Sequence, residues 1–152
     1  MKTFRITDLP QAQVKTETFL DDTVSIISHS GLHITESLLI ERLKYLPAQT
    51  ASLLIAGNRT GAAAMVASTR FPECAITCHS FDLHHARAIL RNLASNQLAF
   101  DFSHDPFVRT AGTKVTNAVE DKNPRFSVAC TSAIPPRTYA TALFMATPGT
   151  MT

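Results

Sequence analysis

The stretch from residue 51 to residue 82 constrains the fold of this chain more than any other part of it. An apolar run, ASLLIAG, is followed by a small-residue turn and by the alanine-rich run GAAAMVASTR, which ends before Phe71 and Pro72. Strong helix formers dominate the second run, whereas a short, wholly apolar run is typical of a strand buried on both faces of a parallel sheet. A second strand pattern, CAITCHSFD, comes next. The sequence therefore predicts a βαβ unit.

A further helix is expected on each side of this unit. After it, LHHARAILRNLASN has helical spacing, with an expected inner face of Leu83, Ala86, Ile89, Leu90 and Leu93. Before it, TESLLIERLKYL predicts an amphipathic helix with Thr35 as N-cap and Pro47 as the stop. The expected apolar side of that helix consists of Leu38, Leu39, Leu43 and Leu46. Helices and strands alternating in this way predict a Rossmann-like α/β fold, an open, mostly parallel sheet with flanking helices.

The two ends of the chain show weaker patterns. Residues 13–29 hold β-formers on both sides of LDD, which predicts a strand pair or hairpin. We therefore expect residues 1–30 to be an extended lead-in and residues 31–152 to be the Rossmann-like domain. Residues 99–125 mix turn residues with short apolar pieces, and because structureless loops of that length are uncommon we expect a short helix or an extended segment there.

Two later runs, RFSVACTSAI and YATALFMATPGTM, predict a third and a fourth parallel strand. The chain stops at Thr152, directly after the Pro-Gly turn that ends the second of them. A fourth strand without a covering helix after it would be exposed on one face. Either the chain is the N-terminal part of a longer domain, truncated after the fourth strand, or its sheet is unusually small.

Composition excludes several classes of protein. A chain of 152 residues with 45% hydrophobic and 17% charged residues can bury a core and is unlike a disordered chain. The net charge of +2 is too small to predict a polyanionic partner. Three cysteines, an odd number, and an N-terminus without an apolar leader favour reduced thiols in a cytoplasmic protein. No apolar run approaches the roughly 20 residues that cross a bilayer, so we expect no membrane association.

The first strand-to-helix turn, GNRTG, has features of a ligand site. Gly57 and Gly61 can each adopt positive φ, and neither has a Cβ that would keep a ligand from the backbone. The start of the following helix is expected to offer amides and a partial positive charge to a polar or anionic group. Asp82, 21 residues after Gly61, ends the second strand and can accept hydrogen bonds from both ribose hydroxyls. The spacing differs from G-x-G-x-x-G, so we expect an adenosine-containing ligand without a pyrophosphate.

At these motifs the chain resembles class I S-adenosylmethionine-dependent methyltransferases. LLIAGNRTGAAAM is similar to their first motif, and ITCHSFD with the helix after it is similar to their acidic second-strand motif. SHSGLHITESLLIERLKYLP resembles the lead-in helix of the ribosomal RNA guanine-N2 methyltransferases, the methyltransferase small-domain group. The resemblance covers residues 25–152 and implies S-adenosylmethionine as cofactor. It implies that Gly57, Asn58, Thr60 and Gly61 line its methionine and ribose side and that Asp82 holds the ribose hydroxyls.

The resemblance also implies a reaction. The fourth-strand motif that positions the amine to be methylated has its counterpart here at residues 146–149, which gives Thr147 and Pro148 the catalytic positions. The implied activity is methyl transfer to an exocyclic amine of guanine, with ribosomal RNA as the partner. Such an in-line displacement depends mainly on positioning.

Three residues depart from the family pattern. Ile55 replaces an acid near the methionine amine, Arg59 replaces the middle glycine, and Thr147 lacks a side-chain amide carbonyl that would accept from the target amine. These departures favour an alternative, a catalytically inactive domain of the same fold that binds RNA or protein. A nicotinamide-dependent oxidoreductase is disfavoured by the glycine spacing.

Several candidate residues also have plain structural interpretations. Asp82 can act as the N-cap of the helix that begins at Leu83, alone or in addition to a ribose contact. Cys130 lies near the site end of the third strand, but no base is identifiable beside it, which argues against a nucleophile. Five residues of the types that bind metal ions lie close together in the sequence: Cys74, Cys78, His79, His84 and His85. Because these cysteines belong to a strand and His84 and His85 to a helix, we expect no metal site, a buried Cys78 and surface histidines.

Overall fold

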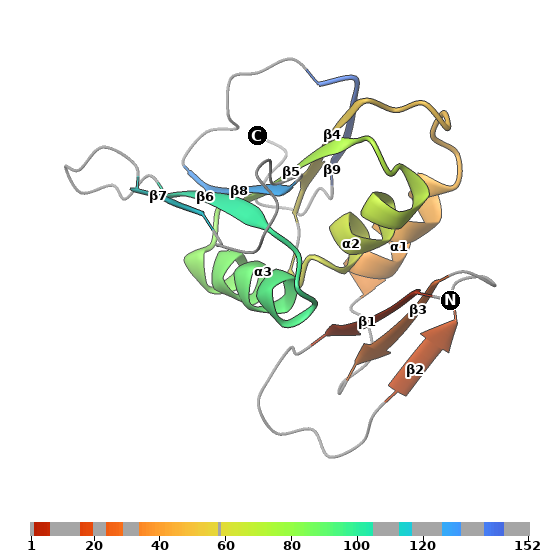
Figure 1. Ribbon diagram of the computed structural model, residues 1–152, viewed down its shortest axis with the longest axis horizontal. Coiled ribbons are helices and arrows are strands. Elements are labelled where there is room, and N and C mark those ends of the chain that lie inside the picture. Colours follow the sequence, from red (N-terminus) through yellow and green to blue (C-terminus); the bar gives the residue numbers. More distant parts are fainter. Residues whose placement is uncertain are drawn as a thin grey trace.

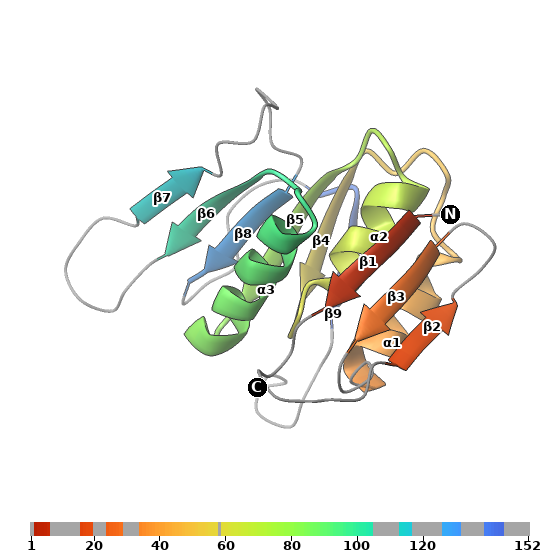
Figure 2. The same ribbon diagram turned by 60° about the horizontal axis from the view of Figure 1, so that its bottom comes forward.

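The computed structural model of the chain has two sheets with a layer of three helices between them (Figures 1 and 2). It describes residues 2–6, 16–19, 24–28, 34–57, 59–104, 113–116, 126–131 and 139–144. The helices are α1 (Ile34–Leu43), α2 (Ala62–Arg70) and α3 (Leu83–Ser95). Their arrangement confirms the expected α/β class.

The larger sheet has six strands in the order β7-β6-β8-β5-β4-β9. Its strands are β4 (Ser52–Ala56), β5 (Ala75–Ser80), β6 (Phe100–His104), β7 (Thr113–Thr116), β8 (Phe126–Cys130) and β9 (Thr141–Phe144). Every neighbouring pair is parallel except β6 and β7, which are antiparallel. The predicted third and fourth parallel strands are thus confirmed as β8 and β9, and the extended structure expected within residues 99–125 is confirmed as β6 and β7.

The smaller sheet has the order β1-β3-β2, formed by β1 (Lys2–Ile6), β2 (Thr16–Phe19) and β3 (Val24–Ser28). Strands β2 and β3 are antiparallel, which confirms the predicted strand pair. Strand β1, which lies parallel to β3, falls within the extended lead-in expected for residues 1–30 but was not predicted as a separate strand. A segment of five residues, KTFRI, with two buried side chains gives too short an alternation to stand out.

The first helix begins earlier and faces another way than predicted. Thr35 lies inside α1 and is not its N-cap. Leu38 is 52% exposed, and the buried side of the helix contains Leu39, Ile40 and Leu43 together with Glu36. The run SLLIERL contains consecutive apolar residues, which lie about 100° apart around a helix. The pattern therefore fits two buried faces that differ by one residue.

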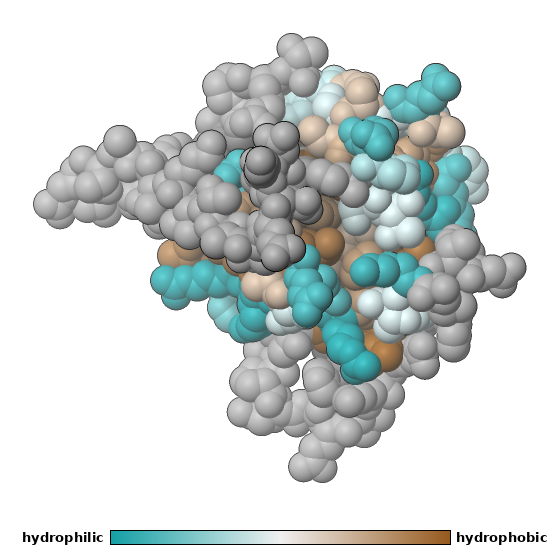
Figure 3. All heavy atoms as spheres, in the orientation of Figure 1, coloured by the Kyte–Doolittle hydropathy of each residue, from teal (hydrophilic) through white to brown (hydrophobic). Residues whose placement is uncertain are grey.

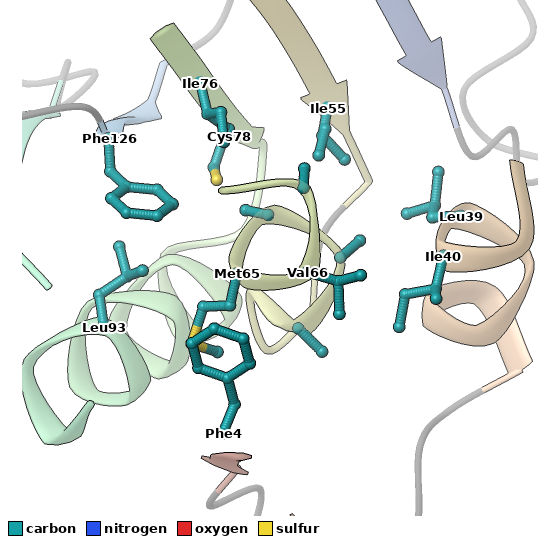
Figure 4. Packing of buried hydrophobic residues seen from close by; sticks show 14 of the residues in the cluster. Phe4, Leu39, Ile40, Ile55, Met65, Val66, Ile76, Cys78, Leu93 and Phe126 are labelled. Atoms are coloured by element: carbon teal, nitrogen blue, oxygen red, sulfur yellow. The ribbon is translucent and has the colours of Figure 1, made fainter. Parts of the chain in front are cut away.

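Helix α2 is the centre of the core (Figure 4). All residues from Ala62 to Ser68 are buried, so the first two turns of the helix have no solvent-facing side. Figure 4 shows Met65 directed at Phe4 of the small sheet and Val66 directed at α1, with Ile55 of β4 on the other side of the helix. Small alanine side chains let both sheets and α1 approach the helix closely, as in helices that are buried all round.

Hydrogen bonds from Asn96 join the small sheet to α3. The Nδ2 of Asn96 donates to the carbonyl of Arg5 at 2.8 Å, and the amide of Arg5 donates to Oδ1 of Asn96 at 2.9 Å. The side-chain amide therefore pairs with β1 as a neighbouring strand would. Because Phe4 and Ile26 also belong to the main hydrophobic cluster, the small sheet and the large sheet share one core.

Polar side chains are spread over the described part of the surface in the view of Figure 3. Within the described residues, none of the helices combines the length and the apolar character that a bilayer crossing requires.

Candidate functional site

The candidate site lies where the order of the large sheet reverses. From β4 the chain continues to β5 on one side, whereas β9 lies on the other side of β4. In open α/β sheets, ligands bind at such a switch point, beyond the carboxyl ends of the strands. Gly57 directly follows β4, is exposed and has φ +86°, and its amide donates to the carbonyl of His79 at 3.3 Å. Gly57 thus lies at the carboxyl edge of the sheet, with the positive φ that was predicted.

The carboxylate of Glu36 occupies the amides of the β4–α2 turn. Its Oε1 accepts from the amide of Arg59 at 2.7 Å and from that of Thr60 at 2.8 Å, and its Oε2 accepts from the amide of Ala63 at 3.3 Å. Glu36 extends from α1 and is fully buried. The expectation that these amides are open to an anion is therefore wrong, because a carboxylate of the protein already holds them.

Helix α3 holds the same turn from another element. The Nδ2 of Asn92, a buried residue, donates to the carbonyl of Thr60 at 2.9 Å. The hydroxyl of Thr60 accepts from the amide of Ala62 at 3.3 Å, and the residue is only 3% exposed. The polar groups of Thr60 are thus used within the protein, and its contact with a cofactor stays a prediction.

Gly61 and Gly57 have different surroundings. Gly61 has φ +84° and is buried, and a Cβ placed on it would lie 3.2 Å from Cγ2 of Ile89. Its lack of a side chain therefore serves the close approach of α3 as well as the left-handed backbone. Gly57 is the glycine of the pair that is exposed. Asn58, between them, lies outside the described residues.

Asp82 is the N-cap of α3, as predicted. Its Oδ1 accepts from the amide of His84 at 2.8 Å, and its Oδ2 lies 3.7 Å from Nδ1 of His85. The side chain is exposed at the end of β5. Because a carboxylate has about four acceptor positions, the cap leaves capacity for a ligand hydroxyl. The ribose role of Asp82 stays a prediction, and the predicted catalytic residues Thr147 and Pro148 lie outside the described residues.

The structure describes two of the three residues that depart from the family motif, Ile55 and Arg59. Ile55 is fully buried in the core, where its side chain lies between β4 and the helix layer (Figure 4). An acid at this position would need partners that its apolar surroundings do not offer. The side chain of Arg59 is half-exposed, while its backbone amide is held by Glu36.

Three buried polar side chains have roles at the site that the sequence does not predict. Glu36 and Asn92 hold the turn, as described above. His79, considered above only as part of a metal group, is buried, with its Nε2 3.2 Å from the carbonyl of Thr131 and its ring edge-on against Phe81 at 4.4 Å between centroids. His79 thereby joins the ends of β5 and β8. None of these roles has a local sequence signal, since the partners lie 23, 32 and 52 positions away along the chain.

The thiols of Cys78 and Cys130 both have a raised pKa. Cys78 is fully buried, as predicted, and burial raises the pKa of its thiol, with the charge of Glu36 adding to the effect. Burial and, second, the charge of Asp82 raise the pKa of Cys130. Thiols are poor nucleophiles when they stay protonated. Among the described residues no cluster of three or more His, Cys, Asp or Glu side chains could hold a metal ion, and His84 is exposed.

The raised pKa of Cys78 predicts a loss of stability at high pH. Below pH 9, the ordinary value, the thiol is protonated in both the folded and the unfolded chain and has no effect. Above it, only the unfolded chain gains by ionising, so from pH 8 to pH 10 the free energy of unfolding should fall by roughly 1 kcal/mol for this group. Urea denaturation at both pH values checks this. The free energy of unfolding of Cys78→Ala should fall by that amount less than that of the wild type. An equal fall in both proteins would contradict it.

A cavity of about 270 Å³ lies away from this site. It is lined by residues 48–51 and 71–73, which precede β4 and β5. It therefore opens at the amino ends of the strands, the edge opposite to Gly57 and Asp82.

Comparison with known proteins gives no relative. No protein-family model, no curated protein and no solved structure matches the chain.

Proposed function

We propose that the chain is a Rossmann-like methyltransferase domain that binds S-adenosylmethionine and transfers its methyl group to an exocyclic amine of guanine in ribosomal RNA. The observation that supports this most is that two exposed residues, Gly57 and Asp82, follow the carboxyl ends of the neighbouring parallel strands β4 and β5. An exposed glycine lets a ligand approach the end of β4, and an exposed carboxylate at the end of β5 can accept from ribose hydroxyls.

The proposed chemistry asks little of ionisable groups. Methyl transfer from a sulfonium is an in-line displacement: the amine nitrogen forms the new bond to the methyl carbon, the sulfur keeps the electron pair of the broken bond, and the methylated nitrogen then releases a proton to solvent. The contribution of the protein is to hold the two reactants in line. The residues at the acceptor end would be Thr147 and Pro148, on the resemblance alone.

Calorimetric titration with S-adenosylmethionine and S-adenosylhomocysteine tests the proposal. We expect both to bind and Asp82→Ala to bind about 10–100-fold more weakly, because hydrogen bonds to a charged acceptor are lost. Asp82→Ser keeps an N-cap for α3 but removes the carboxylate, so it should keep the thermal stability of the wild type and still bind weakly.

Glu73→Ala is the matched control, because Glu73 lines the cavity at the opposite edge of the sheet. It should leave affinity unchanged. Absence of heat from either ligand at millimolar concentration would exclude the cofactor site. Weak binding by Asp82→Ala but full binding by Asp82→Ser would assign Asp82 to capping alone.

A second function is favoured by the burial of Ile55. Since the position of the expected acid belongs to the core, the chain fits a catalytically inactive domain of the same fold that binds RNA or protein. In that case S-adenosylmethionine binds weakly or not at all. Recovery of tighter binding in Arg59→Gly would indicate a cofactor site that has decayed, since the cation near the sulfonium is removed.

A further inference from the structure

We propose that the carboxylate of Glu36 takes the place of a ligand anion at the β4–α2 turn, so that the site binds a nucleoside ligand without phosphate. This inference rests on the proposed function for the adenosine part of the ligand. The role of Glu36 itself depends only on the contacts of its carboxylate.

Phosphate groups bind at the start of a helix through free backbone amides and the positive end of the helix dipole. In this turn four of those amides already have acceptors. The amides of Arg59, Thr60 and Ala63 point at Glu36, and the amide of Ala62 points at the hydroxyl of Thr60. The amide of Gly57, at the carboxyl edge of the sheet, donates to the carbonyl of His79. A phosphate would have to displace these bonds one by one.

The charge of Glu36 acts in the same direction. A buried carboxylate interacts strongly with a nearby charge because little water screens it. Without Glu36, a phosphate at the start of α2 would be attracted by the positive end of the helix dipole. With Glu36 in place, the phosphate is repelled by the negative charge of the carboxylate. A ligand that is neutral or cationic at this point meets no such repulsion. The turn therefore discriminates by charge, independently of the glycine spacing.

Removal of the carboxylate should turn the occupied turn into an anion site. We expect Glu36→Ala to be stabilised by added acetate, formate or inorganic phosphate, with its melting temperature rising by about 3 °C at 100 mM relative to chloride of equal ionic strength. The wild type and Glu41→Ala, an exposed position on the same helix, should show no such rise. If Glu36→Ala does not stay folded, the yield of refolding from urea in acetate against chloride replaces the melting temperature.

Titration with adenosine and adenosine 5′-monophosphate tests selectivity. The wild type should prefer adenosine, and Glu36→Ala should shift the ratio of the two dissociation constants toward the phosphate by about tenfold. An anion response that is the same in wild type and Glu36→Ala overturns the inference, as does an unchanged ratio. If adenosine fails to bind the wild type, the proposed function fails, while the response of Glu36→Ala to phosphate and acetate still decides the role of Glu36.

Discussion

Replacing Glu36 with alanine is expected to lower the free energy of unfolding by about 3–6 kcal/mol. The substitution leaves three backbone amides without acceptors, and each buried unsatisfied donor costs about 1–3 kcal/mol. The favourable interaction of the carboxylate with the start of α2 is lost as well. Domains of this size have total stabilities of about 5–15 kcal/mol, so this one change could unfold the protein at 37 °C.

Urea denaturation followed by circular dichroism measures this effect. Glu36→Gln keeps one carbonyl oxygen for the amides of Arg59 and Thr60 and should cost about 2 kcal/mol. Glu41→Ala removes only a surface ion pair with Lys44 and should change the free energy of unfolding by less than about 1 kcal/mol. Equal effects at positions 36 and 41 would mean that the turn does not depend on the buried carboxylate.

Alanine at Gly61 is expected to cost about 2–4 kcal/mol. The left-handed backbone, with φ +84°, costs about 1–2 kcal/mol for a residue with a Cβ. The new methyl group would lie 3.2 Å from Cγ2 of Ile89, so α3 must shift or Ile89 must leave its rotamer. Gly57→Ala is the matched comparison, because Gly57 has nearly the same φ but is exposed. It should cost only the backbone part, and thermal denaturation of the two variants separates the contributions.

A double-mutant cycle isolates the contact with Ile89. Leucine has the volume of isoleucine but no Cγ2, so Gly61→Ala should cost less in an Ile89→Leu background than in the wild type. Additive effects of the two changes would place the whole cost of Gly61→Ala in the backbone conformation.

The sequence predicts the parts of this fold that depend on local patterns. Three elements are predicted by local patterns: β4 by its apolar run, α2 by its alanine-rich run and α3 by its amphipathic pattern. Asp82 is recognisable as an N-cap from its position before α3. Prediction is weaker where two alternatives differ by one residue, as for the buried face of α1. Leu38 and Leu39 are equally apolar, and only the packing of α1 beside α2 decides between them.

The candidate site is less predictable than the fold, because its central contacts join distant residues. The positive φ at Gly57 and Gly61 follows from the residue type, but the carboxylate that holds the turn comes from 23 residues earlier. Nothing in TESLLIERL distinguishes Glu36, which is buried, from Glu41, which is exposed. The carboxylate of Glu36 and the amides of the turn meet only once α1 and α2 have packed together. Their hydrogen bonds then form because buried amides without acceptors would destabilise the protein.

The link between Asn96 and β1 has a consequence for the order of folding. Arg5 and Asn96 are 91 positions apart, and β1 also packs against α2. During synthesis β1 and its neighbour β3 therefore emerge before α2 and α3, against which β1 packs. Contacts of such separation close late because the intervening chain must first lose its freedom. Strand β1, although it is made before α2 and α3, should thus be among the last elements to reach its final place, and until then Phe4 and Ile6 would be open to water.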